Sequence, residues 1–317
     1  MNRFSHALVG VALAFVSISA WAQYPTKPIR LIVPLAAGGP SDSAARVVGQ
    51  ALSQALGQSV VIENKPGADG AIAAETVLNS PPDGYTLFWS GTSAMLGVPL
   101  LRKNPPYDPV SFTPVSFAVR FTLFLYSHPG VPAKTLSELI EYARANPGKL
   151  NCATSTFGDV VAAAQFMKAA GIKMTRVPYK GGTQAITDLV AGRVEVAIAP
   201  ASLGLPHAKE GRLRALAVFL PQRSPAAPDV PTMMEAGIPG VSVPWAAVFG
   251  PPEMPVEIAE RLSREINVVV QQPGVRTQLE RLAILGEGST PQALAVFLKE
   301  ELEKSRRIVR EYGITQE

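Results

Sequence analysis

The stretch at residues 24–46 places a short apolar run, a glycine turn and a helical pattern in immediate succession. Gly38 and Gly39 separate the apolar run from small and apolar residues at helical spacing. This order predicts a buried strand that leads into a helix, which we expect to begin at Ser41 or Asp42. The first N–H groups of such a helix have no partner within it, and they lie at the positive end of its dipole. The stretch therefore predicts an anion site.

Strand, polar loop and helix alternate along most of the chain. Small polar loops follow predicted strands at 90–93, 154–159 and 178–183. This alternation predicts mixed, mostly parallel sheets with helices on both faces, and ligands of such sheets bind at the carboxyl ends of the strands. Two largely apolar stretches, 115–127 and 243–249, predict crossover strands between two lobes. The predicted fold is α/β, with two hinged lobes and a cleft between them.

Residues 1–22 carry the features of a secretory signal peptide. Arg3 provides a positive start, 7–18 form an apolar core, and Ala20 and Ala22 make an A-x-A cleavage signal. The apolar run is shorter than the ~18–20 residues of a membrane-spanning helix. We therefore expect an exported protein whose mature chain begins near residue 23.

Composition excludes several functional classes. The 29 Lys and Arg residues exceed the 25 Asp and Glu residues only mildly, and the basic cluster at 304–310 directly follows Glu300, Glu301 and Glu303. A solvated helix face explains that cluster better than a nucleic-acid partner does. His128 and His207 lack metal-ligand spacing, and the single Cys152 cannot form an internal disulfide. Nucleotide-loop motifs are also missing. Together these observations lead us to predict no metal, no cofactor and no catalytic residue.

Eight motifs in a fixed order resemble one protein family. They are YPTKPIRLIVPLAAGGPSDSAAR, VIENKPGADG, PPDGYTL, FTPV, VPYKGG, DLVAGRVEV, LRALAV and PDVPTMMEAGIPG. The chain is similar to the solute receptors of tripartite tricarboxylate transporters, also called Bug proteins, which are extracytoplasmic binding proteins of Gram-negative bacteria. The resemblance implies a two-lobed periplasmic-binding-protein fold of the second type. Lobe 1 would comprise residues 23–122 and 246–317, and lobe 2 would comprise 123–245.

The resemblance also implies a function. The protein would be a monomeric periplasmic receptor that binds a small organic carboxylate in the cleft and delivers it to membrane transporter subunits. The ligand-binding positions that match the family's motifs, or that stand beside them on the cleft, are Leu35, Ala37, Gly38, Gly39, Asp42, Thr92, Ser93, Thr156, Phe157, Asp159, Tyr179 and Ala199.

Three positions depart from the family pattern. Leu96 and Gly97 stand where an asparagine is common, and Ala199 stands where an aspartate is common. The loop at 155–159 is shorter than usual and has no nearby histidine. These departures leave the anion site of lobe 1 intact and alter the opposite wall.

Two aspartates have two interpretations each. Asp42 and Asp159 both stand beside a predicted helix start, where either could cap the helix or contact the ligand. If Asp159 faces the cleft, it favours a ligand with an amine or another positive group.

Other positions also keep two interpretations. Phe157 could stack on a flat or aromatic ligand or fold back onto the core. Tyr179 is the better candidate contact in its turn, because Lys180 fits a solvated lysine. Trp245 fits hinge packing.

Two other functional classes remain possible. A ligand-binding sensor for a membrane signalling protein would have the same sequence features. An enzyme on the same scaffold is disfavoured, because the chain shows no nucleophile–base pattern.

Overall fold

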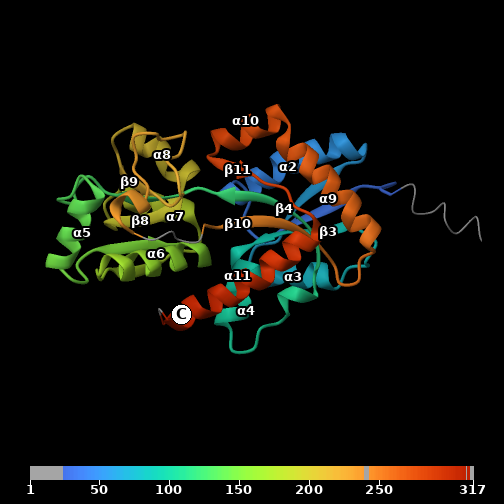
Figure 1. The fold of residues 1–317 in the computed structure, drawn as a ribbon, viewed down its shortest axis with the longest axis horizontal. Helices are drawn as coiled ribbons and strands as arrows, with labels where there is room; N and C mark the ends of the chain where they lie inside the picture. The colour runs from blue at the N-terminus through green and yellow to red at the C-terminus, as the bar shows by residue number, and fades with distance from the viewer. Residues whose placement is uncertain (1–23, 239–242, 312, 315–317) are drawn as a thin grey trace, which may run out of the picture.

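The computed structural model describes residues 24–238, 243–311 and 313–314. Their strands and helices form two groups that lie side by side, each built on its own sheet (Figure 1). The predicted signal peptide lies outside the described residues. Within the described part of the chain, no helix has both the length and the apolarity that a membrane crossing needs.

The first sheet has the strand order β11-β4-β10-β3-β1-β2. Its strands are β1 (Ile29–Val33), β2 (Val60–Asn64), β3 (Thr86–Gly91), β4 (Thr113–Phe121), β10 (Trp245–Gly250) and β11 (Ile284–Gly286). Its helices and helical turns are α2 (Pro40–Leu56), η2 (Ala68–Gly70), α3 (Ala71–Leu78), η3 (Ser93–Gly97), α4 (Val98–Leu101), η4 (Pro109–Ser111), α9 (Val256–Gln271), α10 (Pro273–Arg281) and α11 (Pro291–Glu311). Strand β1 pairs in parallel with β2 and β3, whereas the pairs that involve β4 and β10 are antiparallel.

The second sheet has the strand order β7-β6-β8-β5-β9. Its strands are β5 (Leu123–Ser127), β6 (Asn151–Thr154), β7 (Thr175–Pro178), β8 (Val196–Pro200) and β9 (Arg214–Val218). Its helices are α5 (Leu136–Ala145), α6 (Phe157–Ala170), α7 (Gly182–Val190), α8 (Ala201–Lys209) and the turn η5 (Met234–Ala236). Strand β6 pairs in parallel with β7 and β8, and β5 pairs antiparallel with β8 and β9. Both sheets are therefore mixed, and their parallel pairs belong to the strand–helix–strand units.

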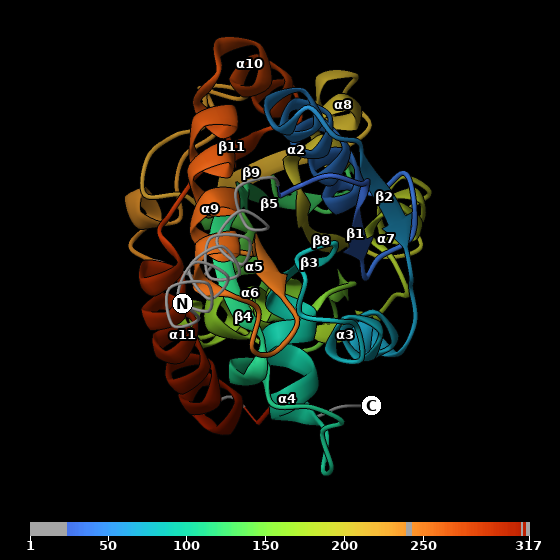
Figure 2. The same cartoon turned by 90° about the vertical axis from the view of Figure 1, so that its right-hand side faces the viewer.

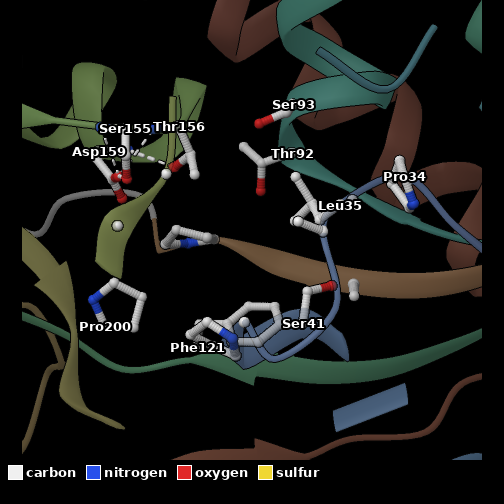
Figure 3. A pocket seen from close by; sticks show the side chains of 18 of the residues that line it. Pro34, Leu35, Ser41, Thr92, Ser93, Phe121, Ser155, Thr156, Asp159 and Pro200 are labelled. Carbon is white, nitrogen blue, oxygen red and sulfur yellow. Dashed lines mark hydrogen bonds between the residues drawn. The ribbon is translucent and has the colours of Figure 1, made fainter. Parts of the chain in front are cut away.

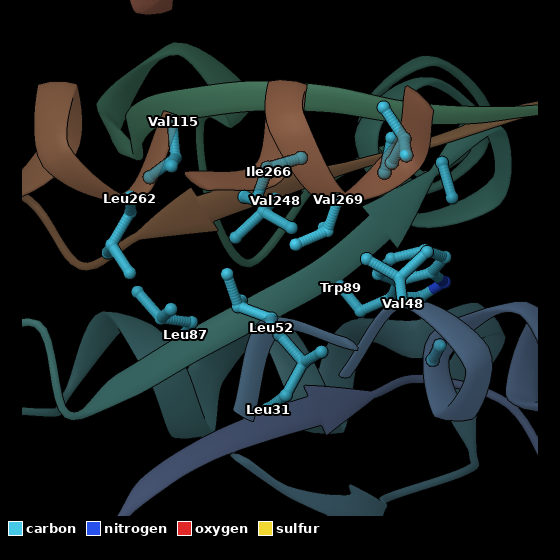
Figure 4. Close-up of a cluster of buried hydrophobic side chains, with 14 of the residues drawn as sticks. Leu31, Val48, Leu52, Leu87, Trp89, Val115, Val248, Leu262, Ile266 and Val269 are labelled. Atoms are coloured by element: carbon cyan, nitrogen blue, oxygen red, sulfur yellow. The ribbon is translucent and has the colours of Figure 1, made fainter. Parts of the chain in front are cut away.

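Helices cover both faces of each sheet, as the apolar strands require. On one face of the first sheet, Leu31 packs with Leu52 of α2 and Ile266 of α9 (Figure 4). The opposite face is covered by α3 and α11, and the view along the long axis places α2 and α3 on opposite sides of β1 and β3 (Figure 2). Helices α5 and α6 cover one face of the second sheet, and α7 and α8 cover the other. Each fully buried leucine or isoleucine stabilises the fold by about 1.5–3 kcal/mol.

The chain crosses between the sheets at the two predicted stretches. We expected one strand over 115–127, but the structure ends β4 at Phe121 and begins β5 at Leu123. The break is required because the two strands pair in different sheets. Thr122 between them donates its N–H to Ala283 and accepts a hydrogen bond from the N–H of Ala201. The lobe boundaries stated above stay a proposal.

Candidate functional site

A pocket of about 420 Å³ lies between the two sheets. Figure 3 shows Leu35 and Thr92 on the wall that belongs to the first sheet, and Thr156 and Asp159 on the opposite wall. The walls are built from the loops that follow β1, β3, β6 and β7 and from the last residue of β8. These are carboxyl ends of strands, where open α/β sheets bind ligands.

The loop between β1 and α2 presents backbone donors to the pocket. Helix α2 begins at Pro40, one residue before the predicted range, because proline suits a first helical position. Gly39 is the N-cap of α2, and no side chain caps this helix start. The N–H groups of Gly39, Ser41 and Asp42 precede the first intrahelical hydrogen bond of α2, in which the Ser43 N–H donates to the Gly39 carbonyl.

Glycine is needed at only one of the two positions in this turn. Gly38 has a φ of +82°, in the left-handed region that favours glycine. Gly39 has an extended backbone, with a φ of −80° and a ψ of 169°, and any residue could adopt it. The absence of a side chain at Gly39 therefore leaves the amides open without being required by the backbone.

Asp42 stabilises this turn without lining the pocket. Its carboxylate accepts hydrogen bonds from the N–H of Gly38 at 2.9 Å, from Arg46 at 2.9 Å and from Asn64 at 2.9 Å. Burial raises its pKa, but the bonds from Arg46, Gly38 and Asn64 outweigh burial and hold the pKa below its usual range. Asp42 is 3% exposed and is not among the residues that line the pocket. Gly39 and not Asp42 is therefore the N-cap of α2, and the Asp42 carboxylate stabilises the preceding turn instead of facing the pocket.

The second loop of this wall follows β3. Gly91 approaches β10 so closely that a Cβ would lie 1.8 Å from the carbonyl oxygen of Trp245. Thr92 accepts a hydrogen bond from the Trp245 N–H at 3.2 Å, and Ser93 begins η3. Both Thr92 and Ser93 line the pocket.

Helix α6 begins at Phe157, three residues earlier than the predicted start at Val160. Thr156 is its N-cap, and Thr156 and Asp159 form a reciprocal capping box. The Asp159 carboxylate also accepts hydrogen bonds from the N–H and the hydroxyl of Ser155, at 3.2 and 2.8 Å. Burial raises the pKa of Asp159 despite the bonds from Ser155 and Thr156. Asp159 borders the pocket but is 1% exposed, so its geometry is that of a cap.

Phe157 does not face the pocket. Its side chain packs with η3, where a Cβ on Gly97 would come within 2.9 Å of it. Phe157 and Val161 of α6 thereby join the core cluster of the first sheet. The flat-ligand interpretation of Phe157 is wrong in this structure, because the ring fills the contact between α6 and η3.

The turn after β7 contributes a different residue from the one we expected. The N–H of Tyr179 donates to Thr154, and its hydroxyl donates to Asp188 at 2.9 Å, so the ring is held against α7. Lys180 lines the pocket instead, with residues 181–183 at the start of α7. Burial, followed by the bond to Asp188, raises the pKa of Tyr179.

The end of β8 differs in the same way. Ala199 is buried on the face of the sheet that α7 and α8 cover. The adjacent Pro200 and then Leu203 of α8 reach the pocket.

Eight of the twelve predicted positions line the pocket, and four do not. Those that line it are Leu35, Ala37, Gly38, Gly39, Thr92, Ser93, Thr156 and Asp159. The other four are Asp42, Phe157, Tyr179 and Ala199.

Sequence reasoning missed the apolar part of the lining. Trp89, Phe121 and Leu203 line the pocket, and the Trp89 indole N–H donates to the Ser41 hydroxyl at 3.0 Å. Trp245, expected to pack at a hinge, does pack against Phe117, but it also borders the pocket. Side-chain alternation along β3 could have flagged Trp89, since it lies two residues before Gly91.

The arrangement suits an anion with an apolar body. Helices α2, α6, α7 and α8 all begin at the pocket, and each helix start carries a partial positive charge of roughly half an elementary unit. Among the described lining residues, Lys180 and Asp159 carry the ionisable side chains, and the carboxylate of Asp159 is enclosed by its capping bonds. The pocket therefore offers donors and positive potential.

Comparisons with known proteins identify the family of the chain. Residues 44–314 match the family model described as the tripartite tricarboxylate transporter family receptor. The protein BugT of Bordetella pertussis is 35% identical over 318 residues, covering 97% of this chain and 97% of that protein.

Solved structures are similar over nearly the whole chain. One from R. palustris with adipate is 31% identical, with a TM-score of 0.85 over 92% of this chain and 99% of that one. MatC from Rhodopseudomonas palustris with bound malate is 31% identical, with a TM-score of 0.80 over 90% of this chain and 100% of that one. The two-sheet architecture is that of periplasmic binding proteins. The chain belongs to the tripartite tricarboxylate transporter receptor family.

Proposed function

We propose that the protein is a periplasmic solute receptor that binds a small organic carboxylate in the pocket. It delivers the ligand, as a monomer, to a tripartite tricarboxylate-type membrane transporter. Family membership supports the receptor role, and the structures with adipate and malate support the ligand class. Export by residues 1–22 would place the protein in the periplasm.

The convergence of helix starts on the pocket carries this proposal. The free N–H groups at Gly39 and Ser41 belong to the start of α2, where the dipole favours negative charge. Asp42 stabilises the turn without facing the pocket, so it does not repel a bound carboxylate. Hydrogen bonds to an anion are roughly twice as strong as neutral ones, and closing the cleft around the ligand strengthens them further.

The lining favours some carboxylates over others. Leu35 and Leu203 provide apolar surface for the body of the ligand, and the largely buried rings of Trp89 and Phe121 lie beneath the lining. Asp159, the acid that could have met an amine, is occupied by Ser155 and Thr156. We therefore expect carboxylates with an apolar or aromatic body to bind better than amino acids.

A thermal-shift screen tests the proposed ligand class. The purified protein is mixed with aliphatic and aromatic carboxylates and with amino acids. A ligand at 100 times its dissociation constant stabilises the folded state by about 2.7 kcal/mol and raises the melting temperature. The absence of any shift with every carboxylate would refute the proposal.

Replacement of Gly39 by leucine tests the position of the carboxylate. A Cβ at Gly39 would meet no atom closer than the Ala36 carbonyl oxygen at 3.6 Å, so a side chain can begin there without a clash. The added side chain would cover the free amides, and we expect calorimetry to show at least a ~100-fold loss of affinity, equivalent to roughly two charge-assisted hydrogen bonds.

Gly274→Leu is the matched control, because Gly274 lies in α10 and a Cβ there meets nothing within 4 Å. Unchanged affinity in Gly39→Leu would show that the carboxylate does not bind at the start of α2.

A further inference from the structure

We propose that the protein has a further binding site, for a small molecule that carries a protonated primary amine on an apolar body. The site is a second pocket, also of about 420 Å³, which is a volume typical of small-molecule sites. Its lining includes Tyr24, Asp83, Tyr85, Glu253 and Ile258. The second pocket lies at the amino ends of β1 and β3, whereas the pocket between the sheets lies at their carboxyl ends, so both can be occupied at once.

Two tyrosine rings form an apolar wall of the second pocket, and both are held in place. Tyr24 and Tyr85 meet edge to face, with their ring centroids 5.1 Å apart. The Tyr24 hydroxyl donates to the Gly84 carbonyl at 2.7 Å, and the Tyr85 hydroxyl accepts a hydrogen bond from the Thr26 N–H at 2.9 Å. Because both hydroxyls have backbone partners, the rings are the part of these side chains that is left for a ligand.

A cation of the protein itself already lies against this wall. The Lys27 ammonium is 4.2 Å from the centroid of the Tyr85 ring and 3.4 Å from a carboxylate oxygen of Asp83. A cation is attracted to the face of an aromatic ring, and a carboxylate beside it adds a charge-assisted hydrogen bond. The same two kinds of partner would hold the amine of a ligand.

Glu253 supplies an acid for that amine. It lines the second pocket, and within the described residues its carboxylate forms no ion pair and no hydrogen bond, whereas Asp83 is paired with Lys27. Arg261 of α9 contributes a positive charge near Tyr24, but in the described part of the chain it forms no ion pair with Glu253. An amine at Glu253 therefore gains a partner without breaking an existing pair.

The backbone at Glu253 is a second, independent indication of a site. Its φ of +59° lies in the left-handed region, which is strained for a residue other than glycine. The turn is fixed on both sides of Glu253, because the Thr113 hydroxyl donates to the Pro251 carbonyl at 2.8 Å and accepts from the Met254 N–H at 3.2 Å. Strained residues that the surrounding structure holds in place are concentrated at functional positions such as ligand clamps.

The lining selects the class of ligand. A carboxylate acceptor favours an ammonium group that has N–H donors, and the rings of Tyr24 and Tyr85 with Ile258 favour an apolar body. A water-filled depression with a solvated glutamate is the competing explanation. It would not distinguish an amine from an alcohol of the same shape.

The test compares phenethylamine with 2-phenylethanol, which has the same shape and no charge. Both are titrated into the protein and followed by two-dimensional NMR. The chain used begins at residue 23, so that its own amino terminus, next to Tyr24, is present as a competing cation. Amide signals of Thr26, Tyr85 and Glu253 report on the second pocket, and that of Gly39 reports on the pocket between the sheets.

The variants are Glu253→Gln, Glu253→Gly and the control Glu257→Gln. Glutamine keeps the length of the side chain and removes its charge. Glycine removes the side chain and suits the positive φ, so this variant keeps the turn. Glu257 is exposed, carries the same charge in the first turn of α9 and does not line the second pocket.

We expect phenethylamine to shift the signals of Thr26, Tyr85 and Glu253, and to bind about tenfold more tightly than 2-phenylethanol, as one charge-assisted hydrogen bond implies. Glu253→Gln and Glu253→Gly should each lose this preference by weakening the amine alone. Glu257→Gln should keep it.

Three results would overturn the inference. They are equal binding of the amine and the alcohol, amine-induced shifts at Gly39 but not in the second pocket, and equal losses of amine affinity in the Glu253 and Glu257 variants. The last result would show a general attraction of cations to this surface. The carboxylate screen uses other ligands at the other pocket, so each proposal can fail without the other.

Discussion

The turns that lead into α2 and α6 stand on opposite sides of the pocket and are built alike. Each follows a strand, and each helix has an aspartate as its third residue, Asp42 in α2 and Asp159 in α6. In both turns the carboxylate accepts a hydrogen bond from a preceding backbone N–H at 2.9 Å, from Gly38 in one case and from Thr156 in the other. The sequence pattern and its local role are therefore shared.

The surroundings of the two carboxylates differ. Asp42 meets the guanidinium of Arg46 and the amide of Asn64, and its pKa lies below the usual range. Asp159 meets the uncharged Ser155 and Thr156, and burial raises its pKa. The same residue at the same helical position is thus stabilised as an ion in α2 and disfavoured as an ion in α6.

The difference decides where an anion can bind. In α6 the side chain of Thr156 caps the helix, and the Asp159 carboxylate accepts hydrogen bonds from the N–H groups of Ser155 and Thr156. In α2 no side chain caps the helix, and the N–H groups of Gly39 and Ser41 remain available. Of two similar turns, the uncapped one is the better anion site.

The largest expected effect on stability is at Asp42. Replacement by alanine removes three hydrogen bonds to a buried carboxylate, and we expect the free energy of unfolding to fall by about 2–3 kcal/mol. Arg46→Ala should cost less, about 0.5–1 kcal/mol, because the Arg46 side chain is 52% exposed. Urea denaturation at neutral pH measures both. Equal losses would show that the ion pair, rather than the turn, accounts for the stabilisation.

The second prediction concerns pH. Because the folded-state pKa of Asp159 is raised, its contribution to stability is fully present below the ordinary aspartate pKa of ~3.9 and is lost as pH rises through the raised value. The lowered pKa of Asp42 has the opposite sign: its contribution is present above the ordinary value and is lost as pH falls through the lowered one. The pKa of the neighbouring Cys152 is raised to about 12 by burial and then by Asp159, so this thiol does not titrate in the same range.

Urea denaturation between acidic and neutral pH checks these signs with Asp159→Asn and Asp42→Asn. As pH falls, the stability of the wild type relative to Asp159→Asn should rise, and relative to Asp42→Asn it should fall. Shifts in the same direction for the two variants would contradict the opposite pKa shifts of the two carboxyl groups.

A smaller effect is expected from the N-cap of α6. Thr156→Ala removes the hydroxyl that accepts the Asp159 N–H, and the loss of such a cap typically costs about 1 kcal/mol. Thr183→Ala is the control, because helix α7 has no side-chain cap. The two midpoints of urea denaturation give the comparison, and a loss of similar size in both variants would argue against the capping box.

The smallest effect is expected from giving α2 the kind of cap that α6 has. Gly39→Ser would supply a hydroxyl at the N-cap and should stabilise the protein by a few tenths of a kcal/mol, roughly the difference between serine and glycine at this position. The same hydroxyl would occupy an N–H donor, so carboxylate affinity should fall while the melting temperature rises slightly. Unchanged affinity in a stabilised variant would indicate that these amides do not bind the ligand.

The first turn could be predicted closely because its determinants are local. An apolar run, a glycine that can adopt positive φ and a proline suited to a first helical position all lie within a few residues of Gly38. The start of α6 was predicted too late, although Thr156 and Asp159 carry the spacing of a capping box. Phe157 had been placed in a loop, and its burial depends on η3, a segment some sixty positions earlier whose approach the local sequence does not specify.

The sequence by itself determined the alternation of strands and helices, the family, and the loops that border the pocket. These follow from hydrophobic periodicity, turn residues and motifs that are read within one segment. The tertiary structure alone decided that Lys180 rather than Tyr179 borders the pocket, and that Trp89 and Phe121 line it. Which of two adjacent side chains faces the pocket depends on how β7 pairs with β6 and how the two sheets meet, and these contacts join residues far apart in the chain.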